Sequence, residues 1–182
     1  MGSGTTLVEA KLLNRNAVGV DINPQSKYLS DKNLQFQCDS TSKIFTKCGN
    51  AINLDFMKDN SIDLICTHPP YADIIKYSKS VEGDISLLSA DLFLDEMNKV
   101  ATESFRILKK GQYCAVMIGD IRKRGNVIPL GFKMMECFLE IGFKSKEIII
   151  KEQHNCQSSA FWQSKSNKFY LLAHEYIFVF LK

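Results

Sequence analysis

An apolar run from Asp63 to Cys66 leads directly into the pentapeptide Thr67-His68-Pro69-Pro70-Tyr71. The run has the length of a buried strand, and ligands bind at the carboxyl ends of strands in an open α/β sheet. Prolines fix φ and lack an amide donor, so the carbonyl groups of this segment are held as rigid acceptors. Together with the Tyr71 ring, which can stack on a base, they predict a site for a planar amine. The ordinary alternative is a proline turn with a core tyrosine.

A glycine-containing loop, Gly2-Ser3-Gly4-Thr5, opens a segment with helical spacing of apolar residues. Such glycines let a ligand approach the backbone amides at the positive end of a helix. The loop lacks the third glycine of dinucleotide-binding loops and the Gly-Lys-Ser/Thr of phosphate-binding loops, which argues against kinases and ATPases. Asp21 ends the next apolar strand, where an acid that bonds ribose hydroxyls is expected. Its alternative role is to cap the helix that starts at Pro24.

Helical and strand-like segments alternate along the chain, which predicts an α/β fold with a mostly parallel sheet. We expect a single domain over residues 1–182. The expected helices are 5–13, one from residue 24, 87–108 and 129–141, with Gly111 and Gly142 as stops. The expected strands are 16–21, 34–38, 43–47, 62–66, 113–118, 148–150 and 175–181.

One expected element has no counterpart in the sequence. The glycine loop of a nucleotide-binding unit follows a buried strand, but no strand precedes Gly2. Loss of this first strand from mid-sheet would leave two edges with unpaired backbone groups. We therefore expect a truncated or split chain, and either a homodimer or a partner chain that supplies the strand.

Three segments, GSGTTLVEA, GVDINP and THPPY, together resemble the amino-methylating DNA methyltransferases, which act on adenine N6 or cytosine N4. GNAINLDF is similar to that family's third cofactor motif, and FYLLAHEYIFVF to its closing strand. The resemblance implies a Rossmann-like fold with an antiparallel final strand, S-adenosyl-L-methionine as cofactor, DNA as partner, and a cytoplasmic role in restriction-modification. It implies that the cofactor is bound by Gly2, Ser3, Gly4, Thr5, Asp21, Ile22, Asn50 and Ala51, and the target base by His68, Pro69, Pro70 and Tyr71.

Two positions depart from the pattern of this family. His68 stands where Asp, Asn or Ser is usual, and Asn50 where an acidic residue is common. Only a neutral imidazole accepts a hydrogen bond from an amine, so we expect activity above about pH 6.5. Similar double-proline loops serve enzymes that methylate RNA bases or a glutamine amide, and an inactive fragment that binds DNA or a partner is a further alternative.

The remaining features concern partners and location. The net charge of +3 permits a polyanionic partner without requiring one. Arg122, Lys123 and Arg124 form a basic cluster and Trp162 lies in the polar segment 153–170, so we expect both to contact DNA, although solvated surface and packing are the alternatives. Six widely spaced cysteines predict reduced thiols and no metal site. No apolar run is long enough to span a bilayer and no signal peptide is recognisable, which predicts an intracellular protein.

Overall fold

A computed structural model describes residues 1–154 and 169–182. Its elements in chain order are α1 (Thr5–Leu12), β1 (Ala17–Asp21), α2 (Pro24–Asn33), β2 (Ile44–Cys48), β3 (Ile62–Thr67), the 3₁₀ helices η1 (Ala72–Ile74) and η2 (Ile85–Leu87), α3 (Ala90–Ile107), β4 (Leu108–Ile118), β5 (Ile121–Lys123), β6 (Asn126–Ile128), α4 (Leu130–Ile141), β7 (Lys144–Glu152) and β8 (His174–Leu181). Trp162 and most of the expected 153–170 loop lie outside the described residues.

The strands form two sheets and a hairpin. β1 and β2 make a parallel pair, while a four-stranded sheet has the order β3-β4-β8-β7. In that sheet β3 and β4 are parallel, and β8 runs antiparallel to both of its neighbours. The predicted parallel sheet with an antiparallel final strand is confirmed.

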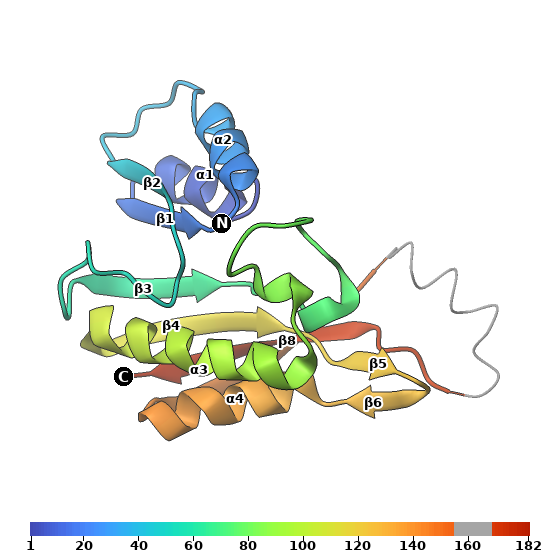
Figure 1. Ribbon diagram of the computed structural model, residues 1–182. Helices are drawn as coiled ribbons and strands as arrows, with labels where there is room; N and C mark the ends of the chain where they lie inside the picture. Colours follow the sequence, from blue (N-terminus) through green and yellow to red (C-terminus); the bar gives the residue numbers. More distant parts are fainter. Residues whose placement is uncertain (155–168) are drawn as a thin grey trace.

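The two sheets are not hydrogen-bonded to each other. Within residues 1–154 and 169–182, β1 pairs only with β2 and β3 pairs only with β4. Figure 1 shows the β1–β2 pair beyond β3, on the side away from β4. No described strand lies between them.

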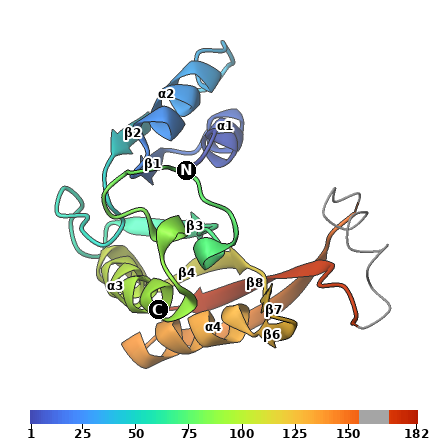
Figure 2. The same cartoon turned by 45° about the vertical axis from the view of Figure 1, so that its right-hand side comes forward.

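The core lies between the four-stranded sheet and the helices α3 and α4, which cover one of its faces (Figure 2). Alternate residues of β4 point into this layer: Cys114, Val116 and Ile118 are fully buried. From α4, the Phe138 ring stacks on Phe180 of β8 with their centroids 4.8 Å apart. This packing fixes β4 and β8, the strands beside which the candidate site is built.

Two sequence predictions about elements were wrong. Residues 34–38 form no strand, and the Lys11 ammonium instead donates hydrogen bonds to the carbonyls of Leu34 and Phe36, at 2.8 and 2.7 Å. Gly111 does not end a helix, because α3 stops at Ile107 and Gly111, with φ of +76°, lies within β4. The spacing of apolar residues continues from α3 into β4, so the sequence does not show where the helix ends.

The described residues also bear on membranes, metals and disulfides. In this part of the chain, no helix combines the length and apolar character that crossing a bilayer requires. The same residues contain no cluster of three or more metal-ligating side chains, and their five cysteines are unpaired.

Candidate active site

The glycine loop is a tight turn supported by α2. Gly2 and Gly4 have φ of +56° and +85°, and Gly4 directly precedes α1. The loop's carbonyls are held from α2, where the Ser30 hydroxyl donates to Gly2 and the Asn33 amide donates to Ser3, at 3.0 and 2.9 Å. A methyl group on Gly4 would lie 2.8 Å from the Ser30 hydroxyl oxygen, whereas one on Gly2 would meet nothing within 4 Å. The loop is therefore closed on the α2 side and open at Gly2. Thr5, the fourth predicted loop residue, begins α1.

Asp21 lies at the carboxyl end of β1, against the same loop. Its carboxylate accepts hydrogen bonds of 2.9 Å from the Met1 amine, the Gly2 amide and the Asn23 amide. Burial alone would raise the pKa of Asp21, but these hydrogen bonds outweigh it and hold the pKa below its usual value. The alternative role as a helix cap is wrong, because the side chain of Asn23 caps α2 by accepting from Gln25.

Ile22 and Asn50, both predicted to bind the cofactor, lie on either side of Gly83, a residue that the sequence analysis did not identify. A methyl group on Gly83 would lie 2.9 Å from the Ile22 side chain and 3.0 Å from the Asn50 amide nitrogen. The loop between η1 and η2 thus reaches the ends of β1 and β2. Ala51, the other predicted residue, is exposed beside Asn50. Only the turn-forming pair Gly83-Asp84 was a signal for this loop in the sequence.

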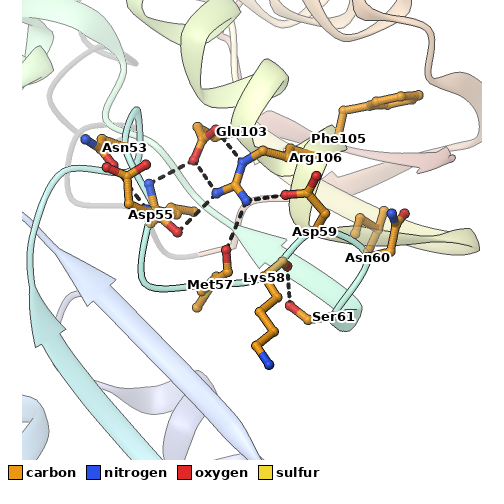
Figure 3. Close-up of polar contacts among 12 residues, drawn as sticks. Asn53, Asp55, Met57, Lys58, Asp59, Asn60, Ser61, Glu103, Phe105 and Arg106 are labelled. Atoms are coloured by element: carbon orange, nitrogen blue, oxygen red, sulfur yellow. Dashed lines mark hydrogen bonds and ion pairs between the residues drawn. The ribbon is translucent and has the colours of Figure 1, made fainter.

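An arginine on α3 anchors the segment that follows Asn50 (Figure 3). The Arg106 guanidinium makes hydrogen bonds of 2.7–3.1 Å with two carboxylates and two backbone carbonyls, those of Glu103 and Asp59 and those of Leu54 and Met57. Glu103 in turn accepts from the Leu54 amide at 2.8 Å. The path from β2 to β3 is therefore tied to α3, which fixes where Asn50 emerges.

The double-proline turn lies at the carboxyl end of β3. His68 is exposed, Pro69 is buried, and Pro70 and Tyr71 are half-buried. The His68 Nε2 atom lies 3.0 Å from the Tyr71 hydroxyl, and the two rings are tilted by 57°. Ala72 follows with no exposed surface and a φ of +47°, a costly conformation for a residue with a Cβ. The turn is thus held rigidly, with His68 facing outward and the Tyr71 hydroxyl inward.

Behind the turn lies a buried carboxylate that the sequence did not reveal. Tyr71 donates a hydrogen bond to Oε1 of Glu175, the second residue of β8, and Lys151 of β7 donates to its Oε2 at 2.6 Å. The Glu175 side chain is only 8% exposed. Burial raises the pKa of Glu175, but the hydrogen bonds from Lys151 and Tyr71 lower it by a larger amount. The net pKa of Glu175 is therefore below its usual value. Glu175 is therefore ionised at neutral pH.

Burial also acts on the two aromatic residues of the turn. It raises the pKa of Tyr71 far above its usual value, with the Glu175 hydrogen bond adding to the effect, so the phenol stays protonated. Burial lowers the pKa of His68, Lys151 lowers it as well, and Glu175 partly offsets both. The net pKa of His68 lies below 6.5, so its imidazole is neutral at physiological pH.

Comparison with known proteins identifies the family. The sequence profile of the N6/N4 DNA methylases matches residues 62–182, from the start of β3 to the end of β8. The chain belongs to this DNA methylase family. The methylase chain is also 25% identical over 162 residues to the type II methyltransferase M.MthZI of Methanothermobacter thermautotrophicus, covering 79% of this chain but 45% of that relative.

Two solved structures support the same fold. TTHA0409 of Thermus thermophilus, inferred to be a DNA modification methylase and solved in complex with S-adenosyl-L-methionine, is 26% identical, with a TM-score of 0.55 over 74% of this chain and 53% of its own. The cytosine-N4-specific PvuII DNA methyltransferase is 18% identical, with a TM-score of 0.58 over 73% of this chain and 47% of its own. The methylase chain has the fold of the S-adenosylmethionine-dependent methyltransferases and spans about half the length of these proteins.

The basic cluster of the methylase lies on the β5–β6 hairpin, which Figure 1 shows projecting from the four-stranded sheet. Arg122 donates to the carbonyls of Gly125 and Tyr170 at 3.0 and 3.1 Å. Lys123 forms a 2.6 Å ion pair with Asp73, just after the double-proline turn. The exposed Arg124 makes no hydrogen bond or ion pair with any residue in the described ranges. The three predicted DNA contacts are therefore unequal, and Arg124 is the one whose charge is available.

Proposed function

We propose that the chain is the catalytic part of an S-adenosyl-L-methionine-dependent DNA methyltransferase that methylates adenine N6 or cytosine N4 inside a prokaryotic cell. The observation that carries the proposal is the His68-Pro69-Pro70-Tyr71 turn at the carboxyl end of β3 in a member of the DNA methylase family. RNA or a protein glutamine as substrate lacks comparable support. M.MthZI is named as a type II methyltransferase, and the PvuII enzyme is named as a DNA methyltransferase.

The residues predicted to hold the cofactor fit such a group. A carboxylate offers about four acceptor positions, and Asp21 uses three of them for amines and amides. One position remains for a ribose hydroxyl. Gly2 adds open space beside it, and Asn50 with Ile22 offers a polar and an apolar side chain for a planar ring. When bound, S-adenosyl-L-methionine supplies a methyl group that is already activated by its sulfonium.

The protein's own task is to align and hold the target amine. An exocyclic amine of a base is a weak nucleophile because its lone pair is delocalised into the ring. Hydrogen bonds from the amine to His68 and to the Pro69 carbonyl favour the pyramidal, attacking form. Stacking on the exposed part of the Tyr71 ring contributes roughly 1–3 kcal/mol, which offsets part of the few kcal/mol needed to extrude a base from the duplex.

The test is tritiated methyl transfer from S-adenosyl-L-methionine to mixed DNA and RNA, followed by nucleoside analysis. We expect label in N6-methyladenine or N4-methylcytosine from DNA. His68→Ala should abolish transfer, while Tyr176→Phe, a change on β8 whose hydroxyl bonds Asp120 and His174 and no residue of the turn, should retain it. Label in RNA or in protein would refute the proposed substrate, and cofactor binding without transfer to any polymer would favour an inactive fragment.

We also propose that a strand from a partner chain or a second copy pairs between β1 and β3. Both edges carry unpaired backbone groups, which favour pairing with another extended segment. Exposed apolar side chains flank the gap: Val18 of β1 is 41% and Leu64 of β3 is 58% exposed.

Hydrogen exchange read by mass spectrometry tests this proposal. For a homodimer, protection of residues 17–21 and 62–67 should rise with protein concentration, while protection of 174–181, paired on both sides, should not change. Rapid exchange of both edges at every concentration would refute the homodimer. Full protection of both edges in the monomer would refute an open gap.

A further inference from the structure

We propose that Glu175 is a positioning residue that, through Tyr71, makes His68 present the bare Nδ1 atom to the target amine. The inference rests on the proposed function, because it specifies how His68 acts in the site described above. It adds a residue of β8 that lies 104 positions along the chain from the tyrosine it contacts.

The polarity of three hydrogen bonds in series carries the argument. The Lys151 ammonium has only donors, and the ionised Glu175 carboxylate has only acceptors. Tyr71 must therefore give its single hydroxyl proton to Glu175. Because that proton is used, the contact of 3.0 Å between the Tyr71 oxygen and His68 Nε2 requires the imidazole to donate.

A neutral imidazole carries one N–H, so donation from Nε2 leaves Nδ1 as an acceptor. No described residue forms a hydrogen bond to Nδ1, and the His68 side chain is 46% exposed. An acceptor on this half-exposed ring is what an attacking amine needs from the residue. An ionised carboxylate at this position would be an acceptor by nature, whereas histidine needs its tautomer to be fixed.

The titratable groups near His68 come from β8, from β7 and from the turn itself. Glu175 of β8 lies 3.8 Å from Nε2, Lys151 of β7 stands behind it, and Tyr71 bonds Nε2 directly. Glu175 and Lys151 change the pKa of His68 in opposite directions. A change of charge at residue 175 should thus move the His68 pKa through space, and the tautomer only through Tyr71.

Glu175→Gln changes both the charge and the hydrogen-bond polarity at residue 175. Lys151 can only donate, so the carbonyl of the new side-chain amide should turn toward it and the NH₂ group toward the Tyr71 oxygen. Tyr71 would then direct its own proton at His68 Nε2, which must accept. The tautomer of His68 is expected to reverse, with Nδ1 now protonated.

The measurement is ¹⁵N NMR of histidine-labelled full chain, since only three histidines are present. At pH 8 the unaltered protein should show His68 with Nε2 protonated, and Glu175→Gln should show Nδ1 protonated. In a Tyr71→Phe background, substitution at residue 175 should no longer affect the tautomer but should still lower the His68 pKa. Tyr176→Phe, which removes the partner of His174, should alter the His174 signals and leave those of His68 unchanged.

The spectra require neither DNA nor cofactor, so they decide the inference independently of methyl transfer. Protonated Nδ1 in the unaltered protein, or no reversal in folded Glu175→Gln, would overturn it. If Glu175→Gln does not fold, Tyr71→Phe alone decides: loss of one hydrogen-bond acceptor should shift the His68 tautomer ratio about 2- to 10-fold toward Nδ1–H. An unchanged ratio in that variant would also overturn the inference.

Discussion

Replacing Gly4 by alanine should damage the cofactor loop through one identified contact. An alanine held at the left-handed φ of +85° costs roughly 1–2 kcal/mol. Its methyl group would stand 2.8 Å from the Ser30 hydroxyl oxygen and 3.0 Å from the Ser30 Cα, so α2 must move. This displacement costs roughly 1–3 kcal/mol of stability. The lower entropy of the unfolded alanine variant returns about 0.4–1 kcal/mol. The expected net loss is roughly 1–5 kcal/mol.

Gly2→Ala is the matched control, because Gly2 also has positive φ but a methyl group there meets nothing within 4 Å. Its loss of stability should be roughly 0–1.6 kcal/mol once the same entropy gain is included. Urea denaturation followed by circular dichroism measures both variants. Equal losses in the two would refute the role of Ser30 in shaping the loop.

The same pair of variants tests the cofactor proposal. The open side of Gly2 is where S-adenosyl-L-methionine should approach, so Gly2→Ala should weaken its binding about tenfold or more, equivalent to ~1.4 kcal/mol. Calorimetric titration of the folded variant gives this number. Unchanged affinity in Gly2→Ala would place the cofactor elsewhere than on the open face of the loop.

Three further outcomes follow from the site. Because His68 is active when neutral and its pKa is lowered, the acid limb of the kcat profile should lie below pH 6.5, and a rate that is flat down to pH 5 would remove His68 from its role. Arg124→Gln should reduce the salt slope of DNA binding by about one unit without loss of stability. Lys123→Gln should also break the ion pair with Asp73 and so lower stability, and equal stability of the two variants would contradict that ion pair. Arg106→Lys keeps the charge but not the forked hydrogen bonds, so it should lower Tm and speed hydrogen exchange over residues 54–61, and normal exchange there would refute the anchor.

Local signals in the sequence were sufficient for the parts of the site that lie on single segments. The glycine loop, the acid at the end of β1 and the double-proline turn each combine a residue type with a nearby strand or helix. The structure places the acid and the double-proline turn at the carboxyl ends of strands, and the glycine loop directly before α1. The helix that begins after Pro129 and ends at Gly142 was predicted for the same reason.

Contacts between distant segments left no such signal. Glu175 is an acid in an apolar strand, and only the fold shows that it bonds Tyr71 and Lys151. Residues 34–38 have the composition of a strand, but the Lys11 side chain satisfies the carbonyls of two of them. Local propensity does not register either effect, because both depend on partners more than 20 positions away.

The division of the sheet has a consequence for how the enzyme would assemble its site. Predicted cofactor residues lie at the ends of β1 and β2, while the base-binding turn follows β3, in the part that matches the methylase profile. Among the described residues, no strand pairing joins these parts; the link is the segment from β2 to β3, held at one end by Arg106, and the Gly83 loop that reaches Ile22. Methyl transfer depends on placing donor and acceptor atoms to within a fraction of an ångström. A strand paired with both β1 and β3 would fix that distance, so its presence should change kcat more than the affinity for either substrate.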